Sequence, residues 1–461
     1  MHRSSNFRNT TRWFVYAAFA LCLTVAVLLE GGVDPVQWQW IAALISLASF
    51  LCLAVRSKRT EDSGMSPELA ILGVLLLWML FQLVPLPPGL VAFLSPQRWS
   101  GALAARIATG ADLRAWLPLS VAPAATLEQL LYVVPAMAAF VAAREMGRWW
   151  GGRRLWIIVA PVIAVALIES WFGFDQFFSA QAASTGPQIV RGTYVNRNHF
   201  AGLLELALPL AIMWAIAILY KAKKRGGEVP AGAAIRSSVL LAIAAGLLTM
   251  VMASLSRMGF IASLAGIAVT AFGWLLLRRE KDHASTPKWL WLIPIVLPLG
   301  VFALFSTNAM VLRFADTPGP GEMTADGRMQ IWTEAVRLIG AYKWTGTGLG
   351  TFEQGLYPIR HLAPDFTFDF AHNDYLQILA ELGVIGGLLA IALAFRVLWK
   401  PISVILESDS LHRALAVGLV GALLAIGLHS LVDFNLYIPA NALAVAWLAG
   451  LAVSPGLEET E

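Results

Sequence analysis

Residues 368–387 read FDFAHNDYLQILAELGVIGG, and they join a polar cluster, His372 to Tyr375, directly to an apolar segment. The cluster closes the longest polar stretch of a chain that otherwise consists of long apolar runs. An apolar helix needs about 20 residues to cross a bilayer, and the segment that begins near 375 has that length. The sequence therefore predicts a spanning helix that begins with an imidazole and a carboxylate at the membrane surface.

The composition of the whole chain also indicates a membrane protein. Of its 461 residues, 58% are hydrophobic and 13% are charged, whereas a soluble domain has about 25% charged residues. We expect an all-α polytopic membrane protein that forms a single membrane domain over 1–461. About twelve apolar runs are long enough to span a membrane, near 13–30, 37–55, 67–85, 123–143, 155–173, 198–220, 237–255, 258–278, 289–306, 375–398, 413–432 and 437–453. Of these, the run near 123–143 has the weakest start, because Pro123 and Glu128 interrupt it.

The distribution of Lys and Arg orients the chain. Roughly two thirds of these residues fall in short connections on one side, which the positive-inside rule assigns to the cytoplasm. Both termini are then cytoplasmic, and two long segments, 86–122 and 307–374, lie outside. The net charge of +4 thus reflects topology and does not indicate nucleic-acid binding. The two cysteines lie inside apolar runs and offer neither a disulfide framework nor a metal-binding spacing.

Arginines on the outer side run against the positive-inside rule and are therefore candidates for function. Arg191 and Arg197 lie in RGTYVNRNHFAG, Arg257 is the only charge in a tight turn, and Arg328 begins GRMQIW in the second long segment. A guanidinium is always charged and binds phosphate oxygens in bidentate fashion. Several arginines at one place would bind a diphosphate. Each one taken alone is equally well explained as an interfacial anchor or as part of a loop salt bridge.

His372 is the strongest candidate for proton transfer. An imidazole has an ordinary pKa of roughly 6.5, so a neutral ring takes up a proton from a hydroxyl near pH 7. Asn373 and Asp374 beside it have two open roles. They orient the ring, or they cap the helix that follows, since both residue types favour helix N-caps.

Further polar residues adjoin the outer ends of other runs. His199 resembles His372 in position, because it also lies between a polar cluster and an apolar run, and a structural role for it is as plausible as sugar binding. Glu205 is expected to face the protein interior and to pair with an arginine. His429 and Asp433 are spaced to share one helix face. We expect Asp433 to line the same cavity as the outer arginines and His372, or to make a structural pair with His429.

Several common motifs are lacking or out of context. The segment 346–350, GTGLG, resembles a nucleotide-binding loop but follows no strand pattern, so we expect a tight turn that approaches a ligand or another segment. The sequence contains neither a zinc-protease motif nor a nucleophile elbow. We therefore expect no cofactor and no metal, with arginines in place of a cation.

The pieces together resemble the bacterial O-antigen ligase and polymerase superfamily over roughly 190–450. The resemblance is carried by YVNRNHFAGLLELALPLA, SLSRMGF, GRMQIWTEAVRLIGAYKWTGTGLGTFEQG, FAHNDYLQILAELGVIG and HSLVDFNLYIPANA. It implies a membrane glycosyltransferase with a GT-C-like fold and a large periplasmic loop, which takes a glycan from an undecaprenyl diphosphate carrier at the periplasmic face of the inner membrane. A ligase passes the glycan to lipid A–core oligosaccharide, and a polymerase passes it to a second lipid-linked glycan.

The resemblance also implies roles for individual residues. His372 corresponds to the loop histidine that acts as base. Arg257 and Arg328, and with a weaker match Arg191, correspond to arginines that bind the diphosphate. No carboxylate is placed as an obvious nucleophile, so we expect a single displacement with inversion.

Alternatives remain open at this point. A repeat-unit polymerase for O-antigen or exopolysaccharide uses the same chemistry as a ligase and differs only in its acceptor. An enzyme that glycosylates proteins is a further member of the same group. A lipid-glycan transporter or flippase is the alternative from another class, and it predicts ionisable residues at the bilayer midplane and broken helices in paired positions.

Overall fold

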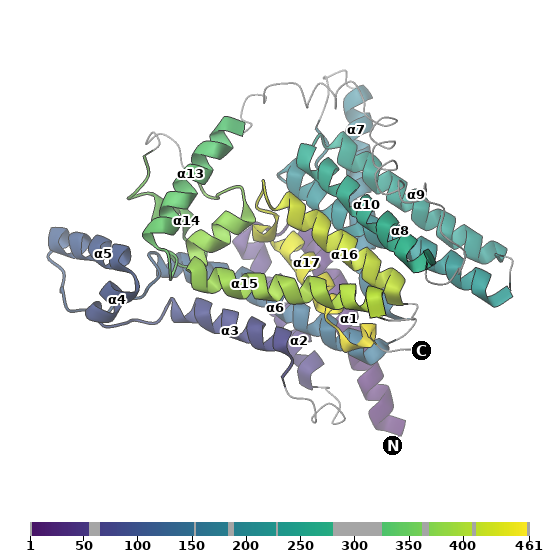
Figure 1. Ribbon diagram of the computed structural model, residues 1–461, viewed down its shortest axis with the longest axis horizontal. Helices are drawn as coiled ribbons and strands as arrows, with labels where there is room; N and C mark the ends of the chain where they lie inside the picture. The colour runs from purple at the N-terminus through teal and green to yellow at the C-terminus, as the bar shows by residue number, and fades with distance from the viewer. Residues whose placement is uncertain are drawn as a thin grey trace.

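The computed structural model describes residues 2–54, 65–151, 154–182, 189–226, 229–279, 325–361, 368–407 and 412–458 (Figure 1). Throughout these ranges the chain is built from helices and their connections, and the described part contains no strand. The elements are α1 (His2–Leu28), α2 (Pro35–Ala54), α3 (Pro67–Phe81), α4 (Pro88–Leu94), α5 (Pro96–Thr109), α6 (Pro123–Trp150), α7 (Leu155–Ala182), α8 (Arg197–Gly226), α9 (Ala231–Ala253), α10 (Arg257–Arg279), α13 (Ala325–Ala341), α14 (Phe352–Leu356), α15 (Asp374–Glu407), α16 (His412–His429), η4 (Asn435–Tyr437), α17 (Pro439–Ala452) and η5 (Pro455–Leu457).

Eight of the described helices are long and apolar enough to cross a membrane: α1, α6, α7, α8, α9, α10, α15 and α16. Three shorter apolar helices, α2, α3 and α17, fall on three further predicted runs. The expectation of an all-α, multi-pass membrane protein is thus confirmed. The predicted span near 289–306 lies outside the described residues. Pro123 proves to be the first residue of α6, a position that proline favours because its missing N–H has no helical partner there.

The helix α8 lies at the centre of the bundle. It packs against α7, α9, α10 and α16, and its side chains from Leu203 to Leu208 are almost fully buried on every face. A helix that is apolar all round is stable only when neighbours surround it. Small residues allow close approach, since a Cβ added at Gly421 of α16 would lie 3.2 Å from the backbone oxygen of Gly266 in α10.

The described helices of the two long polar segments, α4 and α5 of the first and α13 and α14 of the second, lie at one end of the bundle, which we call the loop end (Figure 1). Helices α4 and α5 form a hairpin beyond α3, and α13 and α14 cover the start of α15 (Figure 1). The α13–α14 region has its own small core, which includes Ile331, Leu338, Phe352 and Leu356. These helices are therefore packed parts of the fold.

The GTGLG segment is a turn that packs against other parts of the protein. Its three glycines, Gly346, Gly348 and Gly350, all have positive φ angles. A Cβ at Gly346 would lie 2.2 Å from the carbonyl oxygen of Glu381 in α15. The Glu381 carboxylate in turn accepts the N–H of Gly350 at 2.7 Å. Of the two expectations for this segment, approach to another protein segment is the one the structure shows.

Substitution of Gly346 by alanine is expected to destabilise the protein. A residue with a Cβ costs about 1–3 kcal/mol in this backbone region, and the contact with Glu381 adds to that cost. The matched control is Gly340→Ala in α13, where nothing lies within 4 Å of the added Cβ and alanine favours a helix by roughly 0.5–1 kcal/mol. Thermal unfolding in detergent measures both, and equal midpoints for the two variants would contradict the packing described.

Candidate active site

Polar residues from five segments meet at the loop end of the bundle. Arg197 and Arg257 are the first residues of α8 and α10, and Arg328 lies in the first turn of α13. His372 immediately precedes the N-cap of α15, and Asp433 follows the end of α16. Because each apolar helix begins or ends at the same surface, their polar flanking residues are brought together although they are far apart in the sequence.

Asp433 is buried and organises one side of the site. Its Oδ2 accepts a hydrogen bond from Asn198 Nδ2 at 2.6 Å, and its Oδ1 accepts the N–H of Phe434 at 2.9 Å. His199 Nε2 lies 3.4 Å from Oδ1. Burial alone would raise the pKa of Asp433, but the interaction with His199 outweighs this effect and the pKa is well below its usual range. Asp433 is therefore an anion that faces imidazoles.

The ring of Phe434 is the surface against which both imidazoles pack. Its centroid lies 4.7 Å from that of His199 and 4.8 Å from that of His372, and both contacts are edge-to-face. On a third side, Phe370 stacks on Phe434 at 4.2 Å with an angle of 7° between the planes. Phe434 thus fixes the positions of the two histidines relative to each other.

The backbone of His372 is held in an uncommon conformation. Its φ angle is +48°, a left-handed value that residues other than glycine adopt at a cost and that is often found at functional sites. Burial lowers the pKa of His372, Arg328 lowers it further, and the negative charge of Asp433 partly opposes both effects. The imidazole is consequently neutral near pH 7, the form that accepts a proton.

Three arginines form an electropositive cluster, and Arg328 brings it within range of this histidine. Arg197 lies within electrostatic range of both Arg257 and Arg328, and Arg328 lies within range of His372. All three arginines occupy the first turn of a helix, where the helix dipole already concentrates positive charge. A cation in that position is stabilised by nearby negative charge. The arrangement suits a strongly negative group such as a diphosphate.

Arg191 has its observed contacts within its own loop and with α7. Its guanidinium donates a hydrogen bond to the carbonyl of Val195 at 3.0 Å, and its backbone N–H donates to Gln176 Oε1 at 3.1 Å. Its side chain is exposed. The cluster therefore contains Arg197, which the sequence suggested only as a supporting residue. For Arg191, diphosphate binding stays a prediction.

Asn373 and Asp374 connect the start of α15 to the segment that follows α16. Asn373 is the N-cap, because its Oδ1 accepts the N–H groups of Tyr375 and Leu376 at 3.0 Å. Its Nδ2 donates to the carbonyl of Leu431 at 2.8 Å. Asp374 is fully buried, and its Oδ2 accepts the N–H of Leu436 at 3.2 Å. Both residues hold His372 in place next to Phe434.

A buried hydrogen-bonded pair, Glu205 and His429, differs from the expectation for Glu205. Glu205 of α8 pairs with His429 of α16, whose Nδ1 lies 3.0 Å from Oε2, and both side chains are fully buried. The expectation that Glu205 pairs with an arginine is therefore wrong. His429 and Asp433 do not share a helix face either, because α16 ends at His429. Asp433 lies beyond that end, which is why it faces His199.

Two parts of the site were not apparent from the sequence. Phe370 has no pattern that distinguishes it from other aromatic residues of its segment. Asn198 lies in the polar run Asn196 to His199, next to two residues already considered as site candidates. Its position in that run was a signal that could have identified it. Within the described ranges, no group of three His, Cys, Asp or Glu side chains is arranged to hold a metal ion.

The chain was compared with known proteins and with models of protein families. No curated protein matches the chain. Residues 242–391 match the family model described as O-Antigen ligase. The matched segment contains Arg257, Arg328 and His372, whereas Arg197, His199 and Asp433 lie outside it. This match supports the resemblance of the chain to the O-antigen ligase and polymerase superfamily.

Proposed function

We propose that this protein transfers a glycan from undecaprenyl diphosphate to a sugar hydroxyl of an acceptor, as an O-antigen ligase does. The observation that carries the proposal is the position of one imidazole, His372, which packs against Phe434 and lies within electrostatic range of Arg328, itself within range of Arg197. A base beside an anion site is what the transfer of a sugar away from a diphosphate requires.

The reaction is a single displacement at the anomeric carbon of the donor sugar. His372 takes the proton from the acceptor hydroxyl as its oxygen forms a bond to that carbon. The bond from the carbon to the diphosphate oxygen breaks, and the diphosphate leaves with the electron pair. Arg197, Arg257 and Arg328 stabilise the additional negative charge on the leaving group. The anomeric configuration is inverted, and the proton on His372 passes to water.

Asp433 has a supporting role in this mechanism. As the imidazole gains a proton it becomes a cation between the arginines and Asp433, and the carboxylate stabilises that cation. His199, which lies against Asp433 and Phe434, is placed to donate a hydrogen bond to a sugar hydroxyl.

We place the reaction at the periplasmic face of the inner membrane. The support is the charge distribution of the described helices, because Arg144 of α6 and Arg396 of α15 lie toward the end of the bundle opposite His372. There Arg144 pairs with Glu68 at 3.2 Å, and Arg396 lies 3.5 Å from the same carboxylate. By the positive-inside rule that end faces the cytoplasm, and the loop end faces the periplasm.

The proposal is tested with purified protein and a glycan on undecaprenyl diphosphate. Lipid A–core and a second lipid-linked glycan are offered as acceptors in separate reactions. We expect one of them to be glycosylated, and its identity decides between ligase and polymerase. The configuration of the new linkage is read by NMR, where retention would contradict a single displacement. No product with either acceptor would contradict the proposed function.

A further inference from the structure

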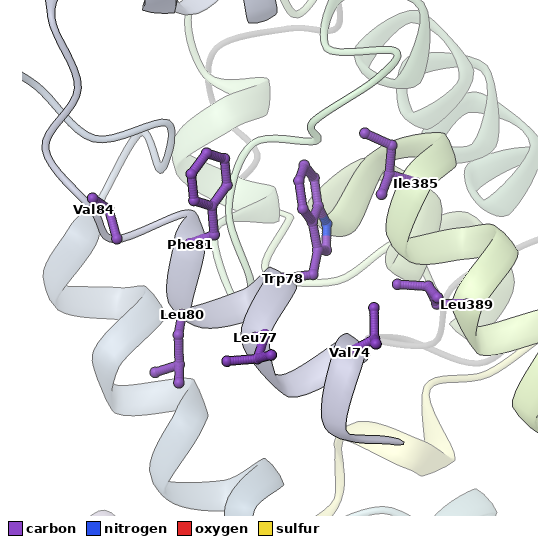
Figure 2. Close-up of a pocket in the computed structure, with 8 residues that line it drawn as sticks. All are labelled: Val74, Leu77, Trp78, Leu80, Phe81, Val84, Ile385 and Leu389. Carbon is purple, nitrogen blue, oxygen red and sulfur yellow. The ribbon is translucent and has the colours of Figure 1, made fainter. Parts of the chain in front are cut away.

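A groove lined by apolar side chains lies between α3 and the part of α15 that follows its kink (Figure 2). It is an open groove with a volume of about 500 Å³, and its walls include Val74, Trp78 and Phe81 from α3 and Ile385 and Leu389 from α15. This volume is within the roughly 300–1,000 Å³ of ligand pockets. All eight lining residues are apolar, so the groove suits a hydrocarbon chain.

The groove is built into the fold by a break in α15. Gly383 has φ 65° and ψ −173°, which interrupts the helix. The carbonyl of Leu382 instead accepts a hydrogen bond from the Trp78 indole at 3.0 Å. A Cβ at Gly386 would lie 3.1 Å from the same indole, so the ring rests directly on the helix backbone. A hydrogen bond and a glycine thus fix one wall of the groove.

The groove and the arginines lie on opposite flanks of the helix that follows His372. The helix α15 packs against α3 on one side and against α16 on the other. Further along, α16 packs against α8 and α10, which begin with Arg197 and Arg257 (Figure 1). His372, at the start of α15, therefore lies between the two features.

We propose that this groove holds a lipid chain of the acceptor, so that the acceptor sugar is anchored in the membrane. The inference rests on the proposed function. In a single displacement the nucleophile and the leaving group occupy opposite faces of the anomeric carbon. The arginines mark the side of the departing diphosphate, so the acceptor approaches from the other flank, where the groove opens. A chain seated there holds the acceptor hydroxyl near His372 and lowers the entropic cost of the encounter.

The test fills the groove from either wall, with Ile385→Trp from α15 and Val74→Trp from α3. The matched control is Leu388→Trp, at a position on α15 that is 62% exposed and does not line the groove. Protein in nanodiscs of phosphatidylethanolamine and phosphatidylglycerol receives the undecaprenyl-linked donor and one of two acceptors, lipid A–core or its fully deacylated form. If a lipid-linked glycan is the substrate instead, the pair is that glycan on undecaprenyl diphosphate and on a short prenyl diphosphate.

We expect both groove variants to raise KM for the long-chain acceptor about tenfold, the effect of displacing roughly two buried methylene groups. The KM for the short-chain or deacylated acceptor, the kcat and the KM for the donor should stay as in the natural protein. Leu388→Trp should change none of these values. An equal rise for both acceptors, no rise at all, or a rise confined to the donor would overturn the proposal. Failure of the proposed function differs from these results, because the unsubstituted protein then gives no product.

Discussion

Replacement of His372 by alanine is expected to lower glycan transfer by at least about 100-fold, because a positioned general base contributes roughly 10²–10⁴-fold. The imidazole is the group that takes the proton from the acceptor hydroxyl, and it lies both against Phe434 and within range of Arg328. The substitution leaves the Asn373 cap and the buried Asp374 intact. The loss should therefore appear in kcat, with the protein still folded.

The matched control for this variant is His361→Ala. His361 lies in the same long segment, but it is exposed, and its backbone N–H donates to Glu334 of α13. The pH profile of the unsubstituted protein provides a further check. Burial and Arg328 lower the pKa of His372, so the neutral base persists to pH values below 6.5, and activity should fall only below that point. A folded His372→Ala variant with unchanged transfer would remove this histidine as the base.

The sequence predicted the elements well because the strongest signal in a membrane protein is the length of an apolar run. The same signal predicted that His372, Arg257 and Arg328 lie on one side of the membrane, since each is next to the start of an apolar or amphipathic helix. What it did not contain is the lateral order of the helices. Glu205 and His429 are 224 residues apart, and only the packing of α8 on α16 makes them partners.

The sequence also did not indicate which segments pack against glycine-rich turns. The GTGLG pattern indicates positive φ angles but not which segment approaches the turn. The neighbour, Glu381, is 31 residues beyond Gly350 and lies on a helix whose kink depends on another glycine. Similarly, Asp433 was assigned to the face of α16 because a spacing of four residues fits a helix. The helix ends at His429, and that end could not be read from apolar residues alone.

Replacement of Arg328 by glutamine is expected to lower kcat for transfer by about 10²–10³-fold, the range for removal of one group that stabilises a developing oxyanion. Arg328 is the arginine that interacts both with Arg197 and with His372, so it connects the anion site to the base. Arg328→Lys should recover only part of the activity, because lysine keeps the charge but loses the bidentate fork.

Two comparisons make this experiment specific to the diphosphate. Arg337→Gln, in the same helix, removes an arginine that is 46% exposed and pairs with the buried Glu334 at 2.8 Å. We expect this variant to be less stable, because Glu334 loses its partner, but the folded protein should transfer at a nearly unchanged rate. Arg191→Gln tests the arginine whose correspondence to the diphosphate-binding arginines of the family is weaker. Because the Arg191 guanidinium contacts its own loop, we expect a smaller loss of kcat than in Arg328→Gln. Binding of undecaprenyl diphosphate without its glycan, measured by calorimetry, should weaken in Arg328→Gln but not in His372→Ala. Equal binding by both variants would show that Arg328 does not contact the diphosphate.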